Sequence, residues 1–589
     1  MTFCPTRWGA IPASTIPAGT DPASIGQASP TSYRFAYWAP SANEISVALN
    51  GETHLLSKAD DGFHRAVLPA RTGDSYRLCV DGDSVNDPTS RLQAGGVLAD
   101  AVLCDGAFEW QNTQPPLAFR DAVILEVHIG TFTAQGTFAA ATEKLRALAQ
   151  LGITVIELLP IGQFGGHRGW GYDGVLPYAP HPAYGTPDDL KRLIDAAHGL
   201  GMLVYLDVVY NHFGPEGNYL PSWCPEFFDA TTHTPWGAAI DFSQAPVRDF
   251  MIDNAVYWLE QYRFDGLRLD AIDQIRGTAG MEMLRDLARR VRAAVPHPIH
   301  LVTEDNRNIS ALHQAAEGLY DGEWNDDYHH AVHCLLTGEA QGYYRSFAAN
   351  PLADLATALT DGYVEQGQPR PGAKSLRGQP PQGMAQSAFI NFNQNHDQIG
   401  NRAGGERLLT LAAPNACKVA HALLLLSPFT PMLFMGEEYG ETAPFQFFTD
   451  FNGELAEIVR KGRQEEFADF EGFKSGALPD PNAVDTFTRS KLGWTADAKA
   501  QHWRDLTRDL LNLRKTRLLP LFATGQACAP KVETAPKKIL ATFAFMAGTL
   551  QLSATFGTPV AAQTTGETLF AQDFSGNFTF CATLQEATE

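Results

Sequence analysis

The stretch Phe264-Asp-Gly-Leu-Arg-Leu-Asp270 is a short apolar run that ends in a carboxylate. Four more stretches share this pattern: Tyr205-Leu-Asp-Val-Val-Tyr-Asn-His212, His300-Leu-Val-Thr-Glu-Asp305, Gly322-Glu-Trp-Asn-Asp-Asp327 and Phe389-Ile-Asn-Phe-Asn-Gln-Asn-His-Asp397. Runs that are apolar along their length are typical of strands in a parallel sheet, because both faces of such a sheet are covered. We therefore expect the carboxylates to gather at one edge of the sheet.

Working outward, the sequence between 121 and 513 alternates apolar runs with stretches of helical spacing. Strands are predicted over 122–129, 154–160, 202–210, 266–271, 299–303, 319–324, 388–393 and 431–435. Helices are predicted over 137–150, 187–198, 246–262, 281–294, 309–316, 328–336, 414–426 and 503–513. Eight such units predict an α/β fold, a (β/α)8 TIM barrel with insertions. The alternative is a doubly wound open sheet, but Glu126-Val-His-Ile-Gly-Thr-Phe132 lacks the Gly-rich turn that such a sheet needs after its first strand.

Two smaller β regions flank this pattern. Residues 32–103 alternate with period two between turn signals such as Asn50-Gly51, which predicts an N-terminal β-sandwich over 1–115. The barrel is expected over 116–520, with a long loop at 350–386 and a helical insertion near 449–499. Alternation returns in Ile539-Leu-Ala-Thr-Phe-Ala-Phe545 and predicts a small C-terminal β-domain over 521–589.

Composition limits the possible partners. The chain has 589 residues, is 44% hydrophobic and carries a formal net charge of -22, which argues against nucleic acid and anionic membranes as partners. The eight cysteines show no metal-ligand spacing, and no apolar segment approaches the ~20 residues of a membrane span. The N-terminus lacks the pattern of a signal peptide. We expect a cytoplasmic protein without a metal or cofactor.

The carboxylates at the strand ends point to glycosidic bond cleavage. That reaction needs one carboxylate as nucleophile or base and one carboxylic acid that protonates the leaving oxygen. Asp270 ends the fourth strand with Arg268 beside it, Glu304 ends the fifth, and Asp397 ends the seventh beside His396. Active sites of TIM barrels lie at this end of the strands. The three carboxylates are therefore the candidate catalytic residues.

Several motifs carry a resemblance to a known family. Asp207-Val-Val-Tyr-Asn-His212, Gly266-Leu-Arg-Leu-Asp270, Thr303-Glu-Asp305 and Asn395-His-Asp397 resemble, in order, the four signature regions of the α-amylase family of glycoside hydrolases. Gly169-Trp-Gly-Tyr-Asp-Gly174, Trp324-Asn-Asp-Asp-Tyr-His-His330, His396-Asp-Gln-Ile-Gly-Asn401 and Gly436-Glu-Glu-Tyr-Gly-Glu441 narrow the resemblance to members that release trehalose from malto-oligosyltrehalose. It covers nearly the whole chain.

The resemblance implies a role for each matching residue. Asp270 would be the nucleophile of a retaining enzyme, Glu304 its acid and base, and Asp397 the group that stabilises the transition state. Asp207 would be a structural partner of Arg268. The substrate-binding residues would be Tyr172, Asp173, His212, Arg268, Asp273, Trp324, Asn325, Asp326, Asp327, His329, His396, Gln398 and Asn401. The resemblance also implies an enzyme that makes the trehalose-capped substrate, a malto-oligosyltrehalose synthase, as a functional partner.

One position departs from the family pattern. Asp273 stands three residues after the expected nucleophile, where His would match the trehalose-releasing members. The resemblance implies that this position borders the leaving sugar. A branching or debranching α-glucan enzyme, which shares the layout of sandwich and barrel, is the alternative function. A non-catalytic glucan-binding protein on the same fold is a third, although all three candidate carboxylates are present.

Overall fold

In the computed structural model, eight parallel strands close into one barrel in chain order, and the last strand pairs with the first. The structure describes residues 8–15, 31–277, 279–314, 316–466, 478–557, 565–575 and 577–587. The barrel strands are β10 (Ile124–Val127), β11 (Val155–Leu158), β14 (Leu203–Val208), β17 (Gly266–Leu269), β18 (His300–Thr303), β19 (Gly322–Trp324), β20 (Phe389–Phe392) and β21 (Thr430–Phe434). The predicted fold class is confirmed, and each of the eight predicted strands overlaps one of these.

Side chains from alternate strand positions fill the barrel. Ile124, Val155, Tyr205, Val302 and Met432 pack together in one fully buried cluster inside it. These residues are branched, aromatic or flexible, as in other barrels whose interior is a packed core. The barrel is therefore closed below its rim, and ligands have access only to the ends of the strands.

Seven of the eight predicted helices are present in the predicted order, with further helices among them. The helices of the described residues are α1 (Ile129–Phe132), α2 (Phe138–Leu151), α3 (Pro187–Gly199), α4 (Leu220–Trp223), α5 (Ala245–Gln261), α6 (Gly280–Ala294), α7 (Asp326–Thr337), α8 (Pro351–Asp361), α9 (His396–Gly400), α10 (Leu408–Leu411), α11 (Pro414–Leu426), α12 (Gly453–Glu466), α13 (Val484–Arg489), α14 (Ala498–Leu513) and α15 (Leu519–Phe522). Two hairpins extend the rim: β12 (Gly162–Gln163) with β13 (Leu176–Pro180), and β15 (Phe228–Thr234) with β16 (Gly237–Ile240). The expected insertion at 449–499 contains α12 and α13, and its residues 467–477 lie outside the described residues.

Two sequence predictions, for residues 309–316 and 350–386, are wrong. The helix expected over 309–316 is absent, and turns run through the described part of that range. Asn308, immediately before this range, has a φ of 50°, and its side chain donates hydrogen bonds to Asp327 and to the Glu365 carbonyl. Side-chain contacts therefore fix the start of this segment in place of a helix. The long loop expected at 350–386 begins with helix α8, whose Leu355 and Leu359 are buried.

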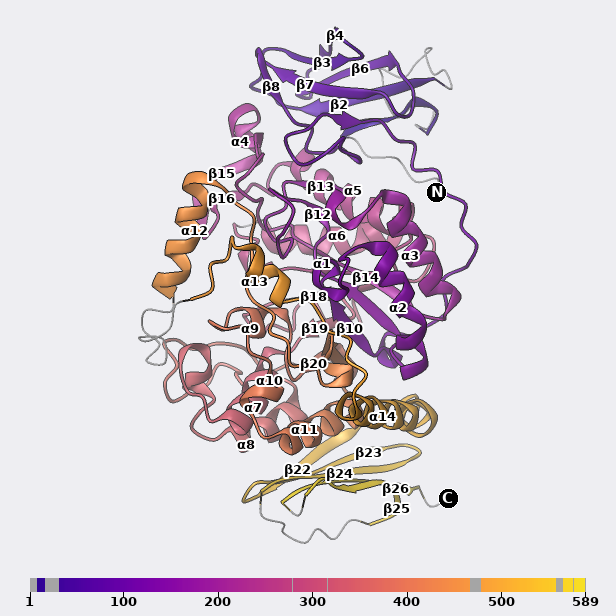
Figure 1. Ribbon diagram of the computed structural model, residues 1–589, viewed down its shortest axis with the longest axis vertical. Coiled ribbons are helices and arrows are strands. Elements are labelled where there is room, and N and C mark those ends of the chain that lie inside the picture. Colours follow the sequence, from indigo (N-terminus) through magenta and orange to yellow (C-terminus); the bar gives the residue numbers. More distant parts are fainter. Residues whose placement is uncertain are drawn as a thin grey trace.

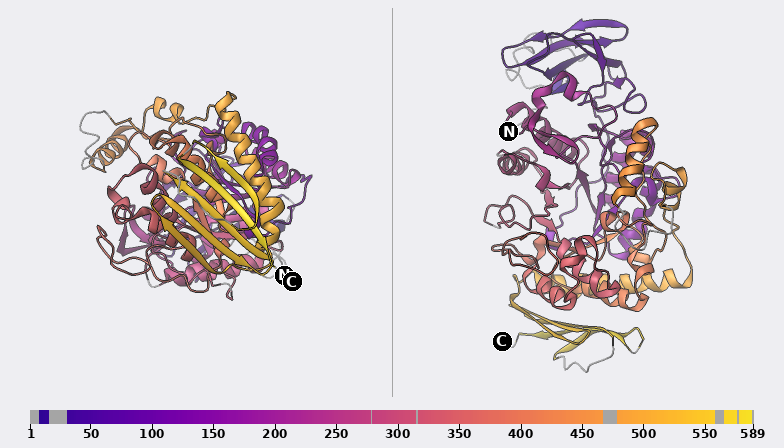
Figure 2. Two further views of the ribbon diagram at one scale, coloured as in Figure 1. Left: turned by 90° about the horizontal axis from the view of Figure 1, so that it is seen from below. Right: turned by 90° about the vertical axis from the view of Figure 1, so that its left-hand side faces the viewer.

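Two β regions stand at opposite ends of the molecule, with the barrel between them (Figure 1). At the N-terminal end, one sheet contains β1 (Gly9–Pro12), β2 (Ser32–Trp38), β6 (Phe63–Pro69) and β5 (Ser57–Lys58), and a second contains β4 (Glu52–Leu55), β3 (Ile45–Leu49), β7 (Ser75–Val80), β8 (Asp83–Val85) and β9 (Ala101–Val102). At the other end, β22 (Cys528–Ala535), β23 (Lys538–Phe545), β24 (Gly548–Phe556), β26 (Phe578–Glu586) and β25 (Glu567–Asp573) form one antiparallel sheet. Figure 2 shows that this last sheet lies across the bottom of the molecule, where it contacts α8 and α11.

Candidate active site

Arg268 lies at the centre of the carboxylates at the barrel rim. Its side chain is fully buried on β17, and Nη1 donates to both oxygens of Asp207, at 2.8 and 2.7 Å, and to Asp270 Oδ1 at 2.8 Å. Nη2 lies 2.6 Å from Glu304 Oε2. The predicted contact between Asp207 and Arg268 is confirmed. Because one planar guanidinium contacts all three carboxylates, it fixes their relative positions.

Asp270 is the first residue after β17 and is held from two sides. Besides the contact with Arg268, its Oδ2 accepts a hydrogen bond of 2.8 Å from Asn211 Nδ2, which also donates to the Asp270 carbonyl. The next residue, Ala271, adopts a left-handed backbone conformation with a φ of 39°, which is rare for a residue with a side chain. The sharp turn that results directs the chain away immediately after the carboxylate.

Glu304 is the first residue after β18, the neighbouring strand. Its Oε2 accepts a hydrogen bond of 2.9 Å from the backbone N–H of Ala271, so the turn after Asp270 also positions this carboxyl group. Burial raises the pKa of Glu304 well above its ordinary value, although the charge of Arg268 opposes this, and the neighbouring charges of Asp270 and Asp397 add to the rise. A carboxyl group that keeps its proton beside one held by two donors is the arrangement that acid-assisted glycosidic cleavage requires.

Asp397 lies farther from its strand than the sequence suggests. β20 ends at Phe392, and Asp397 is in the first turn of the short helix α9. The side chain of Asn395 caps this helix by accepting from the backbone N–H groups of Asp397 and Gln398, and Asn401 Nδ2 donates to Asp397 Oδ1 at 2.5 Å. Burial raises the pKa of Asp397, while the charges of His396 and Arg268 lower it.

Aromatic and imidazole rings line the same rim. Tyr172 stacks on His396 with ring centroids 5.1 Å apart, and its hydroxyl donates to Asp207 at 2.6 Å. His212 Nε2 lies 2.9 Å from the carbonyl oxygen of Tyr172, and its ring stacks on Trp236 at 3.9 Å. These contacts place the three predicted sugar-contacting residues together beside the carboxylates.

His396 is held by a buried carboxylate. Its Nδ1 lies 2.5 Å from Glu126 Oε1, and its backbone N–H donates to Glu126 Oε2 at 2.9 Å. Burial alone would lower the pKa of His396, but the charge and hydrogen bond of Glu126, with the charge of Asp397, raise it above its ordinary value. The sequence analysis missed Glu126, although a glutamate inside the apolar first strand was a signal that could have identified it.

Asp173, Asp273, Asp326 and Gln398 are further predicted substrate-binding residues, and two of them lie beside Asp397. Burial raises the pKa of Asp173 to about 6, and burial also raises the pKa of Asp273, whose Oδ2 accepts from Gln274 at 2.5 Å. Gln398 Nε2 donates to Asp326 Oδ1 at 3.0 Å. Burial, with the charge of Asp397 next, raises the pKa of Asp326 to about 6. The structure thus brings Asp326 and Gln398 together next to Asp397.

Four other predicted substrate-binding residues are buried and have protein partners. The guanidinium of Arg268 lies 4.0 Å from the ring centroid of Trp324. Asn325 donates to the Gly362 carbonyl and to Asn391, and His329 lies within hydrogen-bond distance of the Asn393 carbonyl and the Tyr344 hydroxyl. Asp327, the fourth, is fully buried. These contacts indicate that the four support the rim from beneath.

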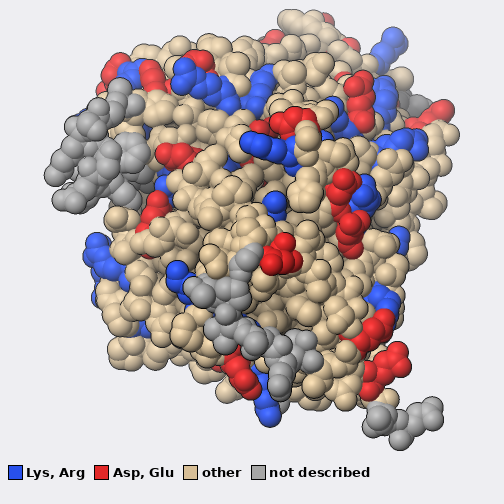
Figure 3. All heavy atoms as spheres, turned by 60° about the horizontal axis from the view of Figure 1, so that its bottom comes forward, with Lys and Arg blue, Asp and Glu red and all other residues tan. Residues whose placement is uncertain are grey.

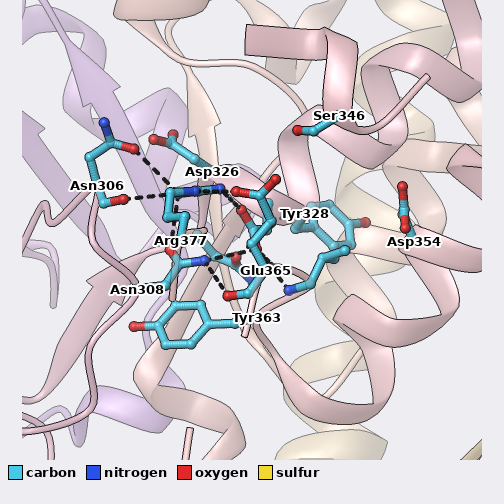
Figure 4. A network of polar contacts seen from close by, with 12 residues as sticks. Asn306, Asn308, Asp326, Tyr328, Ser346, Asp354, Tyr363, Glu365 and Arg377 are labelled. Carbon is cyan, nitrogen blue, oxygen red and sulfur yellow. Dashed lines mark hydrogen bonds and ion pairs between the residues drawn. The ribbon is translucent and has the colours of Figure 1, made fainter. Parts of the chain in front are cut away.

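Asp327 is hydrogen-bonded to residues of the polar network that Figure 4 shows, among them Asn308, Glu365 and Arg377. Its Oδ2 accepts from Asn308 Nδ2 and from the backbone N–H groups of Val364 and Glu365, at 2.7–2.9 Å, and its Oδ1 accepts from Arg377. Arg377 also donates to Glu365 and, at 3.0 Å, to the Asn306 carbonyl. The network joins the turns after β18, the start of α7 and the segment after α8.

Among the described residues, no three or more His, Cys, Asp or Glu side chains are grouped so that they could hold a metal ion.

Comparison with known proteins identifies the family. The family model for the alpha amylase catalytic domain matches residues 99–223. Malto-oligosyltrehalose trehalohydrolase of Deinococcus radiodurans is 41% identical over 82% of this chain and 81% of that protein, and its namesake from Saccharolobus solfataricus is 38% identical over 85% and 86%. A crystal structure of a candidate alpha amylase from Salmonella typhimurium is 44% identical, with a TM-score of 0.91 over 99% of this chain and all of that one. The chain therefore belongs to the malto-oligosyltrehalose trehalohydrolases of the α-amylase family of glycoside hydrolases.

Proposed function

We propose that the protein hydrolyses the α-1,4 bond between a terminal trehalose and the malto-oligosaccharide of malto-oligosyltrehalose. The observation that carries this proposal is the contact of a single buried guanidinium, that of Arg268, with both Asp270 and Glu304. Two neighbouring carboxyl groups, of which burial raises the pKa of Glu304, suit the retaining mechanism. The family membership of the chain supports the choice of substrate.

In the first step, the carboxylate of Asp270 attacks the anomeric carbon of the last glucose of the malto-oligosaccharide. Glu304 gives its proton to the glycosidic oxygen, and the bond to that oxygen breaks, so that trehalose leaves. The product is a covalent ester between Asp270 and the malto-oligosaccharide. Asp397 accepts hydrogen bonds from the sugar hydroxyls and its charge stabilises the positive ring that forms in the transition state.

In the second step, Glu304 takes a proton from a water molecule, and the water oxygen attacks the same anomeric carbon. The ester bond breaks, and Asp270 regains its carboxylate. Two displacements preserve the α configuration of the released malto-oligosaccharide. Asp326 and Gln398 lie beside Asp397 and are proposed to contact the leaving trehalose.

The reaction also implies a partner enzyme and a cellular compartment. A malto-oligosaccharide whose end carries trehalose must be made by an enzyme that converts its last α-1,4 bond to a 1,1 bond, so we propose a malto-oligosyltrehalose synthase as the functional partner. Cys79, Cys104, Cys224, Cys334, Cys417 and Cys528 form no disulfide, which supports a reducing compartment such as the cytoplasm, and Cys4 lies outside the described ranges. No helix of the described residues is both long and apolar enough to cross a membrane.

Product analysis tests the proposal. We expect maltotriosyl-trehalose to give trehalose and maltotriose much faster than maltopentaose gives any product, because polar groups shaped for one sugar discriminate strongly against another. The two pentasaccharides are compared at equal concentration, and the released sugars are identified by chromatography. Equal rates on both substrates would contradict the proposed specificity, and new α-1,6 branches on amylose would favour a branching enzyme.

A further inference from the structure

The insertion between β21 and α14 contacts the turn that carries Asp397. Asn401 is the last residue of this turn, and its Nδ2 donates to Asp397 Oδ1 at 2.5 Å. Arg463 on α12 donates from Nη1 to Asn401 Oδ1 and from Nη2 to the Gly400 carbonyl, each at 3.2 Å. Figure 1 shows α12 beside the barrel, on the side where β15 and β16 lie. A helix distant in sequence is thus linked to a candidate catalytic carboxylate through one side chain.

The amide of Asn401 can orient in two ways, and only one suits Asp397. The NH2 group of an amide donates hydrogen bonds, whereas its oxygen only accepts them. A reversed amide would place its oxygen against the carboxylate, where the two acceptors would repel each other. Since a guanidinium has donors and no acceptor, Arg463 favours the orientation in which Oδ1 faces α12 and Nδ2 faces Asp397.

Arg463 is itself held beside the site. Its guanidinium carbon lies 4.8 Å from the ring centroid of Phe447, and Phe447 packs edge-on against Trp170 at 5.1 Å. Trp170 in turn contacts His396, the neighbour of Asp397, at 5.3 Å. A cation over an aromatic face at this distance is stabilised by the electrons of the ring. Two chains of contacts, one polar and one aromatic, therefore run from Arg463 to the turn of Asp397.

We infer that Arg463 is a positioning residue of the reaction: it orients the Asn401 amide, and the amide orients the carboxylate of Asp397. The inference rests on the proposed role of Asp397. Arg463 makes its contact through Asn401 and has no part in bond making. Loss of Arg463 lets the amide reverse and weakens the hold on Asp397, so stabilisation of the positive transition state falls while binding of the neutral substrate stays the same.

A double-mutant cycle tests this inference. Arg463→Ala is expected to lower kcat about tenfold with KM changed less than about threefold, which corresponds to the loss of one hydrogen bond to a charged system. If Arg463 acts through Asn401, the double variant Arg463→Ala/Asn401→Ala is no slower than Asn401→Ala alone. Arg463→Lys, which keeps a donor, regains part of the rate. Lys461→Ala, on an exposed side chain of the same helix, is the matched control and keeps wild-type kcat.

A second measurement separates positioning from loss of folded enzyme. A glucose-configured imino sugar carries a positive charge that resembles the transition state, and its affinity is expected to fall in Arg463→Ala by the same factor as kcat. Folding is checked by the thermal midpoint and circular dichroism of each variant. An unchanged kcat, an unchanged imino-sugar affinity, or factors that multiply in the double variant would overturn the inference. The cycle can be run on whichever glucan the wild-type enzyme hydrolyses, so failure of the trehalose specificity leaves this test intact.

Discussion

At the scale of single residues, the site is governed by an imbalance of charge. One guanidinium, that of Arg268, contacts the carboxyl groups of Asp207, Asp270 and Glu304, and all of these groups are largely buried. A buried cluster with three carboxylates and one cation favours retention of a proton by one carboxyl group. Burial raises the pKa of Glu304 well above its ordinary value and that of Asp207 to about 6, and because Arg268 donates to both oxygens of Asp207, we assign the proton to Glu304. The hydrogen bonds from Arg268 and Asn211 hold the Asp270 carboxyl group in place for its proposed role as nucleophile.

The proton on Glu304 can be tested by substitution. Glu304→Gln keeps the shape but has no proton to give, so we expect turnover of maltotriosyl-trehalose to fall about 10²–10⁴-fold. Because burial raises the pKa of Glu304, the wild-type enzyme keeps its acid protonated at pH values where an exposed glutamate has lost its proton, and kcat/KM falls only as the pH rises through the raised value. The variant should lose this basic limb of the pH profile. An aryl glycoside with a good leaving group serves as the control, since its first step needs no acid.

Substitution of Asp273 tests how this departure from the family pattern affects binding of the leaving sugar. Asp273→Asn keeps the size of the side chain and removes its charge. We expect KM for maltotriosyl-trehalose to change about 2–10-fold, as the loss of one hydrogen bond would give, with kcat within about threefold. Steady-state kinetics on maltotriosyl-trehalose and maltopentaose measure both values. A fall in kcat as large as that of Glu304→Gln would place Asp273 among the reacting groups instead.

At the scale of elements, the sequence predicts what depends on periodicity and misses what depends on distant partners. The strands were predictable because burial on both faces leaves continuous apolar runs. α8 was missed because the Pro- and Gly-rich residues after it dominated the interpretation of 350–386, although Leu355 and Leu359 have helical spacing. The contact of Glu126 with His396 joins the first strand to the seventh, and no local pattern encodes that pairing.

The network of Asp327 should be a major source of stability for the segments that it joins. Asp327→Ala removes an acceptor from Asn308, from two backbone N–H groups and from Arg377. Removal of one partner of a buried ion pair costs about 3–5 kcal/mol. We expect the free energy of unfolding, measured by urea denaturation, to fall by about that amount. Asp485→Ala, which breaks an exposed pair with Arg489 on α13, is the control and should change stability by less than about 1 kcal/mol.

The turn after β21 should make stability depend on pH. Glu437 is buried there, accepts from the backbone N–H of Phe434 at 3.2 Å, and has a pKa that burial raises from 4.5 to about 7. A raised pKa means that its contribution to stability is fully present below pH 4.5 and is lost as the pH rises to 7. The loss is about 3 kcal/mol. In Glu437→Gln this part of the dependence should vanish, and urea unfolding at pH 4.5 and 7 measures it. Glu438, whose pKa is also raised to about 7, retains its own contribution.

At the scale of the whole molecule, the barrel is enclosed between two β regions and its charge is dispersed. Figure 3 shows Lys and Arg interspersed with Asp and Glu on the face turned toward the viewer. The acidic residues that give the chain its net charge of -22 form no single acidic area on that face. The N-terminal region also contacts the rim, because Asn86 Nδ2 donates to the Gly217 carbonyl at 2.7 Å, five residues after His212. The flanking region therefore supports a loop of the site.

Trp8 links the N-terminal sheets to the barrel, and its loss should reveal how far the two unfold together. Its buried ring packs edge-on against Trp38 and Phe63 of the sheets and against Phe227 and Phe250 of the barrel, at 5.3–6.4 Å.

The indole N–H of Trp8 donates to the Pro246 carbonyl at the start of α5. Trp8→Ala leaves a cavity shared by both regions and should cost about 3–5 kcal/mol. Since the lost contacts join two regions, we expect the single thermal transition of the wild type to broaden or divide in two, with the N-terminal region unfolding first. Trp8→Phe refills most of the cavity and should restore one transition. Calorimetry of the wild type and the two variants measures these transitions. If Trp8→Ala unfolds in one sharp transition at the wild-type temperature, the N-terminal sheets and the barrel are coupled through other contacts.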